Sequence, residues 1–175
     1  PLVKPCATKV GAIDIPDGKR RVHDHPIPRM GGLAIFLGFL LSVVLFADIT
    51  RQVRGILIGS VLIVACGAID DVVNLRAWIK LLVQVAAAVI AVARGVVIEF
   101  FSNHELLVLG WLSIPVTVLW IVGITNSVNL IDGLDGLAVG VSTIASVTMF
   151  VVALLVSEGN VALLLAALMG ACLGF

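Results

Sequence analysis

Four carboxylates and two amides lie in two short stretches of an otherwise apolar sequence. Asp70 and Asp71 are adjacent in GAIDDVVN. The stretch NSVNLIDGLDG places four polar side chains at a spacing of three: Asn126, Asn129, Asp132 and Asp135. Carboxylates held close together repel each other unless a cation or a shared proton relieves them. Both stretches are therefore candidates for a divalent-cation site or a proton-transfer site.

Each acidic stretch also has a structural explanation. Asp70 and Asp71 come at the expected end of an apolar helix, where carboxylates oppose the helix dipole. They would then form a hydrated cap on a short loop. We expect Arg76 and Lys80 to relieve part of the repulsion between the two carboxylates. Gly133 and Gly136 indicate a helix end or an irregular turn, so the second stretch would be a polar turn between helices. The residues alone leave both alternatives open.

A basic segment precedes the first long apolar run. In eleven residues it gathers six side chains: Lys19, Arg20, Arg21, His23, His25 and Arg29. Such a cluster commonly fixes membrane topology or binds acidic lipid headgroups. Here Pro26 and Pro28 stiffen the chain, and Gly31 and Gly32 allow close approach of the backbone. We therefore interpret the segment as a phosphate-binding edge.

The composition places these stretches in a membrane protein. Hydrophobic residues make up 61% of the 175-residue chain and charged residues 13%, and the mean hydropathy is +1.20. These values are outside the range of soluble globular domains. Apolar runs predict six helical spans, at residues 33–47, 55–69, 79–98, 112–125, 137–156 and 161–175. We expect an all-α, multi-pass transmembrane domain over residues 1–175, with residues 1–32 as a basic cytoplasmic segment.

The distribution of lysine and arginine predicts the orientation of the spans. Residues 1–30 and 70–80 carry eight of the eleven Lys and Arg residues. The positive-inside rule then places both segments, together with residues 125–136, at the cytoplasmic face. Carboxylates that suit Mg²⁺ and bases that suit phosphate are what phosphoryl transfer between a nucleotide and a lipid requires. The residues themselves favour this activity.

Three segments resemble successive motifs of the polyprenyl-phosphate N-acetylhexosamine-1-phosphate transferases. They are RRVHDHPIPRMGGLAIFLGF, GAIDDVVNLRAWIKLLVQ and NSVNLIDGLDGLAVGVS, in the order and spacing of that family. Three matches are far more specific than any one of them, and together they cover nearly the whole chain. The form VHDHPIPRMGG is more similar to the branch that uses UDP-N-acetylglucosamine and undecaprenyl phosphate than to the phospho-MurNAc-pentapeptide branch.

The resemblance implies a reaction in which an oxygen of the lipid phosphate attacks the sugar-proximal phosphorus of a UDP-sugar. UMP is released, and a lipid-linked sugar pyrophosphate remains. The implied catalytic residues are Asp70, Asp71, Asp132 and Asp135. The implied metal is Mg²⁺, with Mn²⁺ as an alternative, held near Asp70, Asp71 and Asp132. The implied substrate-binding residues are Lys19, Arg20, His23, Pro28, Arg29, Gly31, Gly32, Asn74, Asn126 and Asn129.

The resemblance also sets the expected partners and location. The partners are undecaprenyl phosphate, a UDP-sugar, membrane lipids and a second copy of the chain in a homodimer, and nucleic acid is not expected. The location is the bacterial cytoplasmic membrane, with the site on the cytoplasmic face, where the product would initiate synthesis of a cell-envelope polysaccharide. Family members have about twice this length and roughly ten or eleven spans in one bundle. Their downstream acidic Mg²⁺ motif and His-rich loop would lie beyond Phe175, so we expect this chain to be part of a longer transferase.

Two other functions fit some of the same residues. A cation- or proton-coupled transporter would use membrane carboxylates as its ion path. Transporter sites tend to lie near the membrane midplane, whereas the carboxylates here fall at the ends of predicted spans. A non-enzymatic lipid-binding or assembly subunit is the other alternative.

Overall fold

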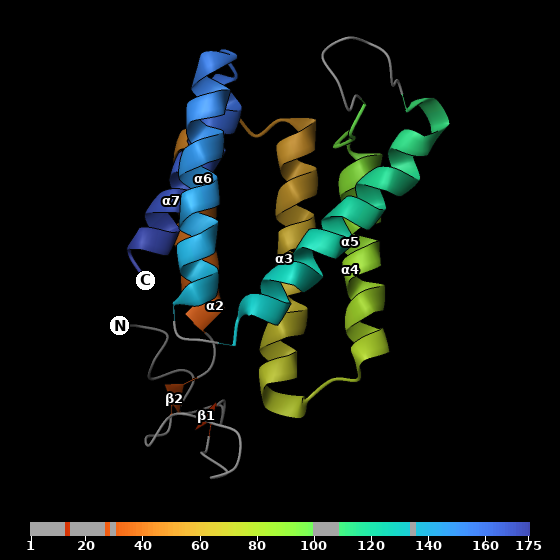
Figure 1. The fold of residues 1–175 in the computed structure, drawn as a ribbon, viewed down its shortest axis with the longest axis vertical. Coiled ribbons are helices and arrows are strands. Elements are labelled where there is room, and N and C mark those ends of the chain that lie inside the picture. The colour runs from red at the N-terminus through yellow and green to blue at the C-terminus, as the bar shows by residue number, and fades with distance from the viewer. Residues whose placement is uncertain (1–12, 15–26, 29–30, 100–108, 134–135) are drawn as a thin grey trace.

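The computed structural model describes residues 13–14, 27–28, 31–99, 109–133 and 136–175. Six α-helices make up most of these parts: α2 Gly31–Phe46, α3 Arg51–Val73, α4 Ala77–Ala93, α5 Ser113–Ile131, α6 Leu137–Leu155 and α7 Gly159–Leu173. A 3-10 turn, η1 (Gly110–Leu112), leads into α5, and the short strands β1 (Ile13–Asp14) and β2 (Ile27–Pro28) pair antiparallel. The predicted helical class is confirmed (Figure 1).

Each predicted apolar run corresponds to one helix. Three helical segments are long and apolar enough to cross a membrane: Arg51–Val73, Gly110–Ile131 and Leu137–Leu155. The helices α2, α4 and α7 are equally apolar but have only 16, 17 and 15 residues. At about 1.5 Å per residue they fall short of a hydrocarbon core of about 30 Å. The chain is a multi-pass helical membrane protein with spans of unequal length.

Several helix ends differ from the prediction, and α3 is four residues longer at each end than the predicted run 55–69. The helix α4 ends at Ala93 instead of residue 98, because Gly95 has a φ of +93° and turns the backbone out of the helix. The helix α5 continues to Ile131, six residues beyond the predicted 125. Asn126 and Asn129 therefore lie on the last turns of a helix.

The helices form two groups of three, as Figure 1 shows. In one group α4 packs against both α3 and α5, and in the other α7 packs against both α2 and α6. The contacts between the groups, α2 with α3 and α5 with α6, are much less extensive. The helix α5 crosses its group obliquely (Figure 1). We call these groups the α3–α4–α5 group and the α2–α6–α7 group.

Small residues allow α3 and α4 to approach closely. A Cβ atom added at Gly59 would lie 3.1 Å from the carbonyl oxygen of Ala87, and one at Gly55 would lie 2.6 Å from Cβ of Arg94. Ala87 and Ala91 on α4 are buried in this contact region. Small residues at helix interfaces are the usual means by which membrane helices pack without a hydrophobic driving force. This packing fixes where the polar ends of α3 and α4 lie.

The two acidic stretches lie at the same end of the molecule. The end of α3, the start of α4, the end of α5 and the start of α6 all lie toward the bottom of Figure 1, where α2 also begins. This arrangement agrees with the predicted alternation of spans. The fold therefore gathers the polar segments that the sequence places far apart.

Candidate active site

Asp70 holds together the short connection between α3 and α4. Its Oδ1 accepts a hydrogen bond of 2.8 Å from the backbone N–H of Leu75. Its Oδ2 lies 2.6 Å from Nζ of Lys80, and the two side chains are 26% and 33% exposed. This ion pair confirms the expected role of Lys80 at the end of α3, while the same role for Arg76 stays a prediction. The structure thus gives Asp70 the loop-fixing role that was the alternative to catalysis.

Asn74 ends α3 through its backbone. Its φ is 51°, in the left-handed region that asparagine adopts more readily than most residues. Its N–H donates to the carbonyl oxygen of Asp70 at 2.9 Å, while its side chain is exposed. The residue is a helix cap here, and its binding of substrate stays a prediction.

Asp71 occupies a different side of α3 from Asp70. Successive residues of a helix do not face the same way. Asp70 is turned toward Lys80 of α4, and Asp71 is half-buried in the same last turn. Asp70 therefore bonds to the connection between α3 and α4, while the Asp71 carboxylate has another orientation.

The second acidic stretch begins in a helix and ends in a turn. Asn126 and Asn129 are exposed on the last turns of α5, and Asp132 caps the helix by donating its backbone N–H to Val128 at 3.2 Å. Gly136, with a φ of +75°, precedes α6. The helix end that the glycines predict is confirmed. At a spacing of three, Asn126, Asn129 and Asp132 are successive neighbours along α5.

Gln84 connects this stretch to the rest of its helix group, and sequence reasoning missed it. Its Oε1 accepts a hydrogen bond of 2.6 Å from Nδ2 of Asn126. Gln84 lies one turn after Lys80 on α4, so neighbouring side chains of one helix contact both acidic stretches. A glutamine four residues after a lysine in an otherwise apolar helix was the signal available in the sequence.

The basic segment is only partly described. Lys19, Arg20, His23 and Arg29 lie outside the described residues, as does Asp135 of the second acidic stretch. The backbone of Pro28 pairs with Ile13. A Cβ atom at Gly31 would lie 2.6 Å from the Phe175 ring, whereas one at Gly32 would meet nothing within 4 Å. Gly31 therefore has a packing role, and phosphate binding by these residues stays a prediction.

Carboxylate oxygens of the kind that Mg²⁺ prefers are present at this end of the molecule. However, no group of three His, Cys, Asp or Glu side chains able to hold a metal ion occurs among residues 31–99, 109–133 and 136–175. Both oxygens of Asp70 already accept from protein donors. The donor chemistry thus fits Mg²⁺, but the described residues do not assemble the predicted trio of Asp70, Asp71 and Asp132 into a cage.

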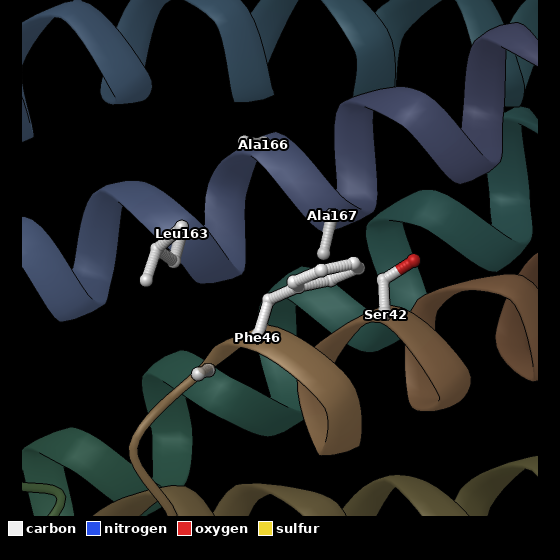
Figure 2. Close-up of a pocket in the computed structure, with 6 residues that line it drawn as sticks. Ser42, Phe46, Leu163, Ala166 and Ala167 are labelled. Atoms are coloured by element: carbon white, nitrogen blue, oxygen red, sulfur yellow. The ribbon is translucent and has the colours of Figure 1, made fainter.

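A hollow of about 230 Å³ lies away from these residues, between α2 and α7. Figure 2 shows the Phe46 ring beside Ala167, with Ser42 on the neighbouring turn of α2. The lining is almost wholly apolar, and the Ser42 hydroxyl donates to the carbonyl oxygen of Gly38 in its own helix. The hollow has no acid or base for catalysis, so the candidate site remains at the polar helix ends.

Comparison with known proteins agrees with this arrangement. Residues 53–175 match the profile described as glycosyl transferase family 4. A Bacillus subtilis relative, named probable undecaprenyl-phosphate N-acetylglucosaminyl 1-phosphate transferase, is 46% identical over 94% of this chain and 46% of its own. A Mycobacterium tuberculosis relative, named decaprenyl-phosphate N-acetylglucosaminephosphotransferase, is 35% identical over 99% of this chain and 48% of its own.

A more distant relative comes from Desulfitobacterium hafniense. It is named phospho-N-acetylmuramoyl-pentapeptide-transferase and is 34% identical over 90% of this chain and 55% of its own. The chain thus spans about half the length of these curated relatives. No solved structure matches it. Because the family profile extends over both acidic stretches and all the helices from α4 to α7, this chain belongs to glycosyl transferase family 4.

Proposed function

We propose that the full-length protein transfers N-acetylglucosamine 1-phosphate, or a related N-acetylhexosamine 1-phosphate, from a UDP-sugar to undecaprenyl phosphate. An oxygen of the lipid phosphate forms a bond to the sugar-proximal phosphorus, the bond from that phosphorus to the bridging oxygen breaks, and UMP leaves. The product is a lipid-linked sugar pyrophosphate that initiates synthesis of a cell-envelope polysaccharide. The 46% identity to the Bacillus subtilis transferase is the observation that carries this proposal.

The arrangement of the carboxylates supports phosphoryl transfer at the membrane surface. Asp70, Asp71 and Asp132 lie at helix ends rather than midway along the spans. A headgroup phosphate and a water-soluble nucleotide meet at this depth, whereas an ion path would place its carboxylates near the midplane. Catalysis of phosphoryl transfer depends mainly on positioning and on charge around the phosphorus. The helix ends that carry these carboxylates lie toward the same end of the molecule (Figure 1), which supports such positioning.

The candidate site residues divide the work between them in this proposal. Asp70 and Lys80 fix the connection between α3 and α4, which sets the position of Asp71. Asp71 and Asp132 supply the carboxylates that act on the reacting groups. Asn126 and Asn129 contact the nucleotide sugar, and Lys19, Arg20, His23 and Arg29 bind phosphate oxygens.

We also propose that the reaction requires Mg²⁺, for which Mn²⁺ can substitute. The support is the chemistry of the donors: Asp71 and Asp132 offer hard oxygen ligands beside a site for two phosphate-bearing substrates. A bound divalent ion would neutralise charge on the pyrophosphate of the UDP-sugar.

Measurement of UMP release tests the activity. The full-length protein in nanodiscs should release UMP and form lipid-linked sugar when given undecaprenyl phosphate, UDP-N-acetylglucosamine and Mg²⁺. Release should stop when EDTA is added and return with excess Mg²⁺. Reactions without the lipid are the control. Equal UMP release with and without lipid would indicate a hydrolase, and no release in any condition would rule out the proposed transfer.

The proposed cytoplasmic location can be tested with single cysteines in a variant that lacks the native ones. Cysteines at Asn74 and Ser127 should resist an impermeant thiol reagent added to intact cells and react after the cells are opened. A cysteine at Asp48, in the connection at the opposite helix ends, should react in intact cells. The reverse pattern would place the site outside. The expected homodimer stays a prediction, tested by the mass of the purified protein.

A further inference from the structure

Gln84 and Asn126 form a side-chain hydrogen bond between α4 and α5. The Asn126 amide nitrogen donates to Oε1 of Gln84 at 2.6 Å and to the carbonyl oxygen of Val122 at 2.8 Å. Gln84 is half-buried, and Asn126 is exposed. The bond joins two helices at the end of the molecule that carries the acidic stretches.

This pairing determines which atom of Asn126 is left for a ligand. A primary amide has two N–H donors and one carbonyl oxygen. The two bonds from Nδ2 use both donors, so Oδ1 is the group that Asn126 offers to the site. The carbonyl oxygen of Val122 favours this orientation of the amide because it accepts only from the nitrogen. Gln84 adds the second bond and fixes the amide between α4 and α5. Gln84 and Val122 together therefore hold Asn126 in one of two chemically opposite orientations.

We propose that Gln84 is a positioning residue that orients Asn126 so that its Oδ1 accepts a hydrogen bond from an N–H or O–H group of the nucleotide sugar. This inference rests on the proposed transfer reaction. It adds one residue to the substrate site and states that Asn126 accepts, rather than donates, a hydrogen bond there. It assigns the glutamine a role in binding, although the glutamine itself does not touch the substrate. The recognised group is a donor, because an acceptor on the substrate would face the amide oxygen.

The chain offers a matched control for Gln84. Gln52, on α3, donates from Nε2 to the carbonyl oxygen of Gly95 at 3.1 Å, just beyond the end of α4. It is thus a second glutamine that ties two elements of the same helix group together, but at the opposite helix ends. A residue that matters only for packing should behave as Gln52 does.

The experiment compares Gln84→Met and Gln52→Met in the full-length protein, because methionine matches glutamine in length and removes its polar atoms. We expect Gln84→Met to raise the KM for the UDP-sugar about tenfold, the usual effect of losing one well-oriented hydrogen bond. The KM for undecaprenyl phosphate and the Mg²⁺ concentration for half-maximal rate should stay the same. Gln52→Met should leave all three values at the wild-type level.

Two further variants separate positioning from folding. Gln84→Glu keeps an oxygen acceptor for Asn126 and should retain a KM within about twofold of wild type, even if Gln84→Met folds poorly. In an Asn126→Ala background, Gln84→Met should cause no additional rise in KM, because its effect passes through the amide that is already absent.

Several results would overturn the inference. They are equal effects of Gln84→Met and Gln52→Met, a tenfold rise in Gln84→Glu, or additive effects in the double variant. A shift in the Mg²⁺ requirement instead of the sugar KM would mean that Oδ1 faces a cation. If the wild-type protein turns over and one of these results is found, only the role of Gln84 fails. If the wild-type protein releases no UMP, the proposed function fails and this inference fails with it.

Discussion

The α3–α4–α5 group and the α2–α6–α7 group share a plan but are held together differently. In each, a middle helix packs against two outer ones. Polar bonds connect the helices of the first group at both ends: Lys80 with Asp70 and Gln84 with Asn126 at one end, and Arg51 Nη2 with the carbonyl oxygen of Ala93 at the other. The second group relies more on small apolar contacts, such as that between Gly38 and Ala171.

The difference separates chemistry from support. Polar side chains near lipid are expensive unless they are paired, so their concentration in one group indicates a function there. Close packing of small side chains needs no such pairing and gives a rigid neighbour. We infer that the α3–α4–α5 group carries Asp71, Asn126 and Asn129, which act on the substrates, while the α2–α6–α7 group beyond the first turn of α2 supports them. The predictions below test this division, beginning with the largest expected effect.

The largest difference is expected between Asp71→Asn and Ser146→Ala in the full-length protein. Asparagine keeps the shape of Asp71 but removes its charge, so transfer should fall by about 10² to 10⁴. Ser146 is buried in α6, and its hydroxyl donates within its own helix to the carbonyl oxygen of Ser142. Its loss should change the rate less than about twofold.

Both variants are assayed by the initial rate of UMP release per amount of folded protein. Size-exclusion chromatography measures the folded fraction. A large loss of rate in Ser146→Ala with intact folding would show that the second group takes part in the reaction. Near-normal turnover in Asp71→Asn at saturating Mg²⁺ would make Asp71 structural.

The next effect concerns the close packing of α3 on α4. Gly59→Ala would place a Cβ atom 3.1 Å from a backbone oxygen of Ala87, so the helices must separate slightly. We expect a loss of about 1–3 kcal/mol in stability, typical of overpacking, seen as a lower Tm in detergent. Gly67→Ala on the same helix is the control, because its Cβ would meet nothing within 4 Å. Equal Tm values for the two variants would contradict the close contact.

Much of the helical framework follows from the sequence alone. Apolar runs locate all six helices, since a chain in lipid must satisfy its backbone within helices. Gly133 and Gly136 correctly mark the end of α5. Of the two cations expected beside the acidic pair, Arg76 and Lys80, the structure pairs Lys80 with Asp70. These features depend on local composition or short separations in sequence, which is why a linear reading finds them.

The parts that were missed depend on contacts between distant residues or on side chains that bond to their own helix. The helix α5 runs past residue 125 although the residues there are polar. Asn126 and Ser127 donate to the carbonyl oxygens of Val122 and Gly123 within the same helix. The partner of Gln84 is 42 residues away and is set by the packing of α4 on α5. The three-residue spacing of Asn126, Asn129 and Asp132 is compatible with a helix, but it does not identify the partner of Gln84.

A smaller effect is expected from the ion pair between Asp70 and Lys80. Lys80→Met should lower stability by about 1–2 kcal/mol, between the values for exposed and fully buried pairs. Asp70→Asn/Lys80→Met should lose less than the sum of the two single variants, because each already breaks the pair. Unfolding in detergent measures all four proteins. Strict additivity would mean that the 2.6 Å contact contributes no coupling.

The smallest effect is expected where the second group does contain a polar contact. The Asn160 side chain accepts from the backbone N–H of Asp48 at 3.0 Å and donates to its carbonyl oxygen at 3.1 Å, which ties the start of α7 to the connection after α2. Both bonds are exposed, so Asn160→Ala should lower the free energy of unfolding by about 1 kcal/mol.

Because this contact lies at the helix ends opposite Asp70 and Asn126, kcat and the KM for the UDP-sugar should stay within about twofold of wild type. Asn160→Asp is the matched variant: it keeps the acceptor for the N–H but sets a carboxylate oxygen against the carbonyl oxygen of Asp48, so it should be no more stable than Asn160→Ala. A change of KM in either variant, with Tm unchanged, would show that the α2–α6–α7 group contributes to binding and that the division between the groups is wrong.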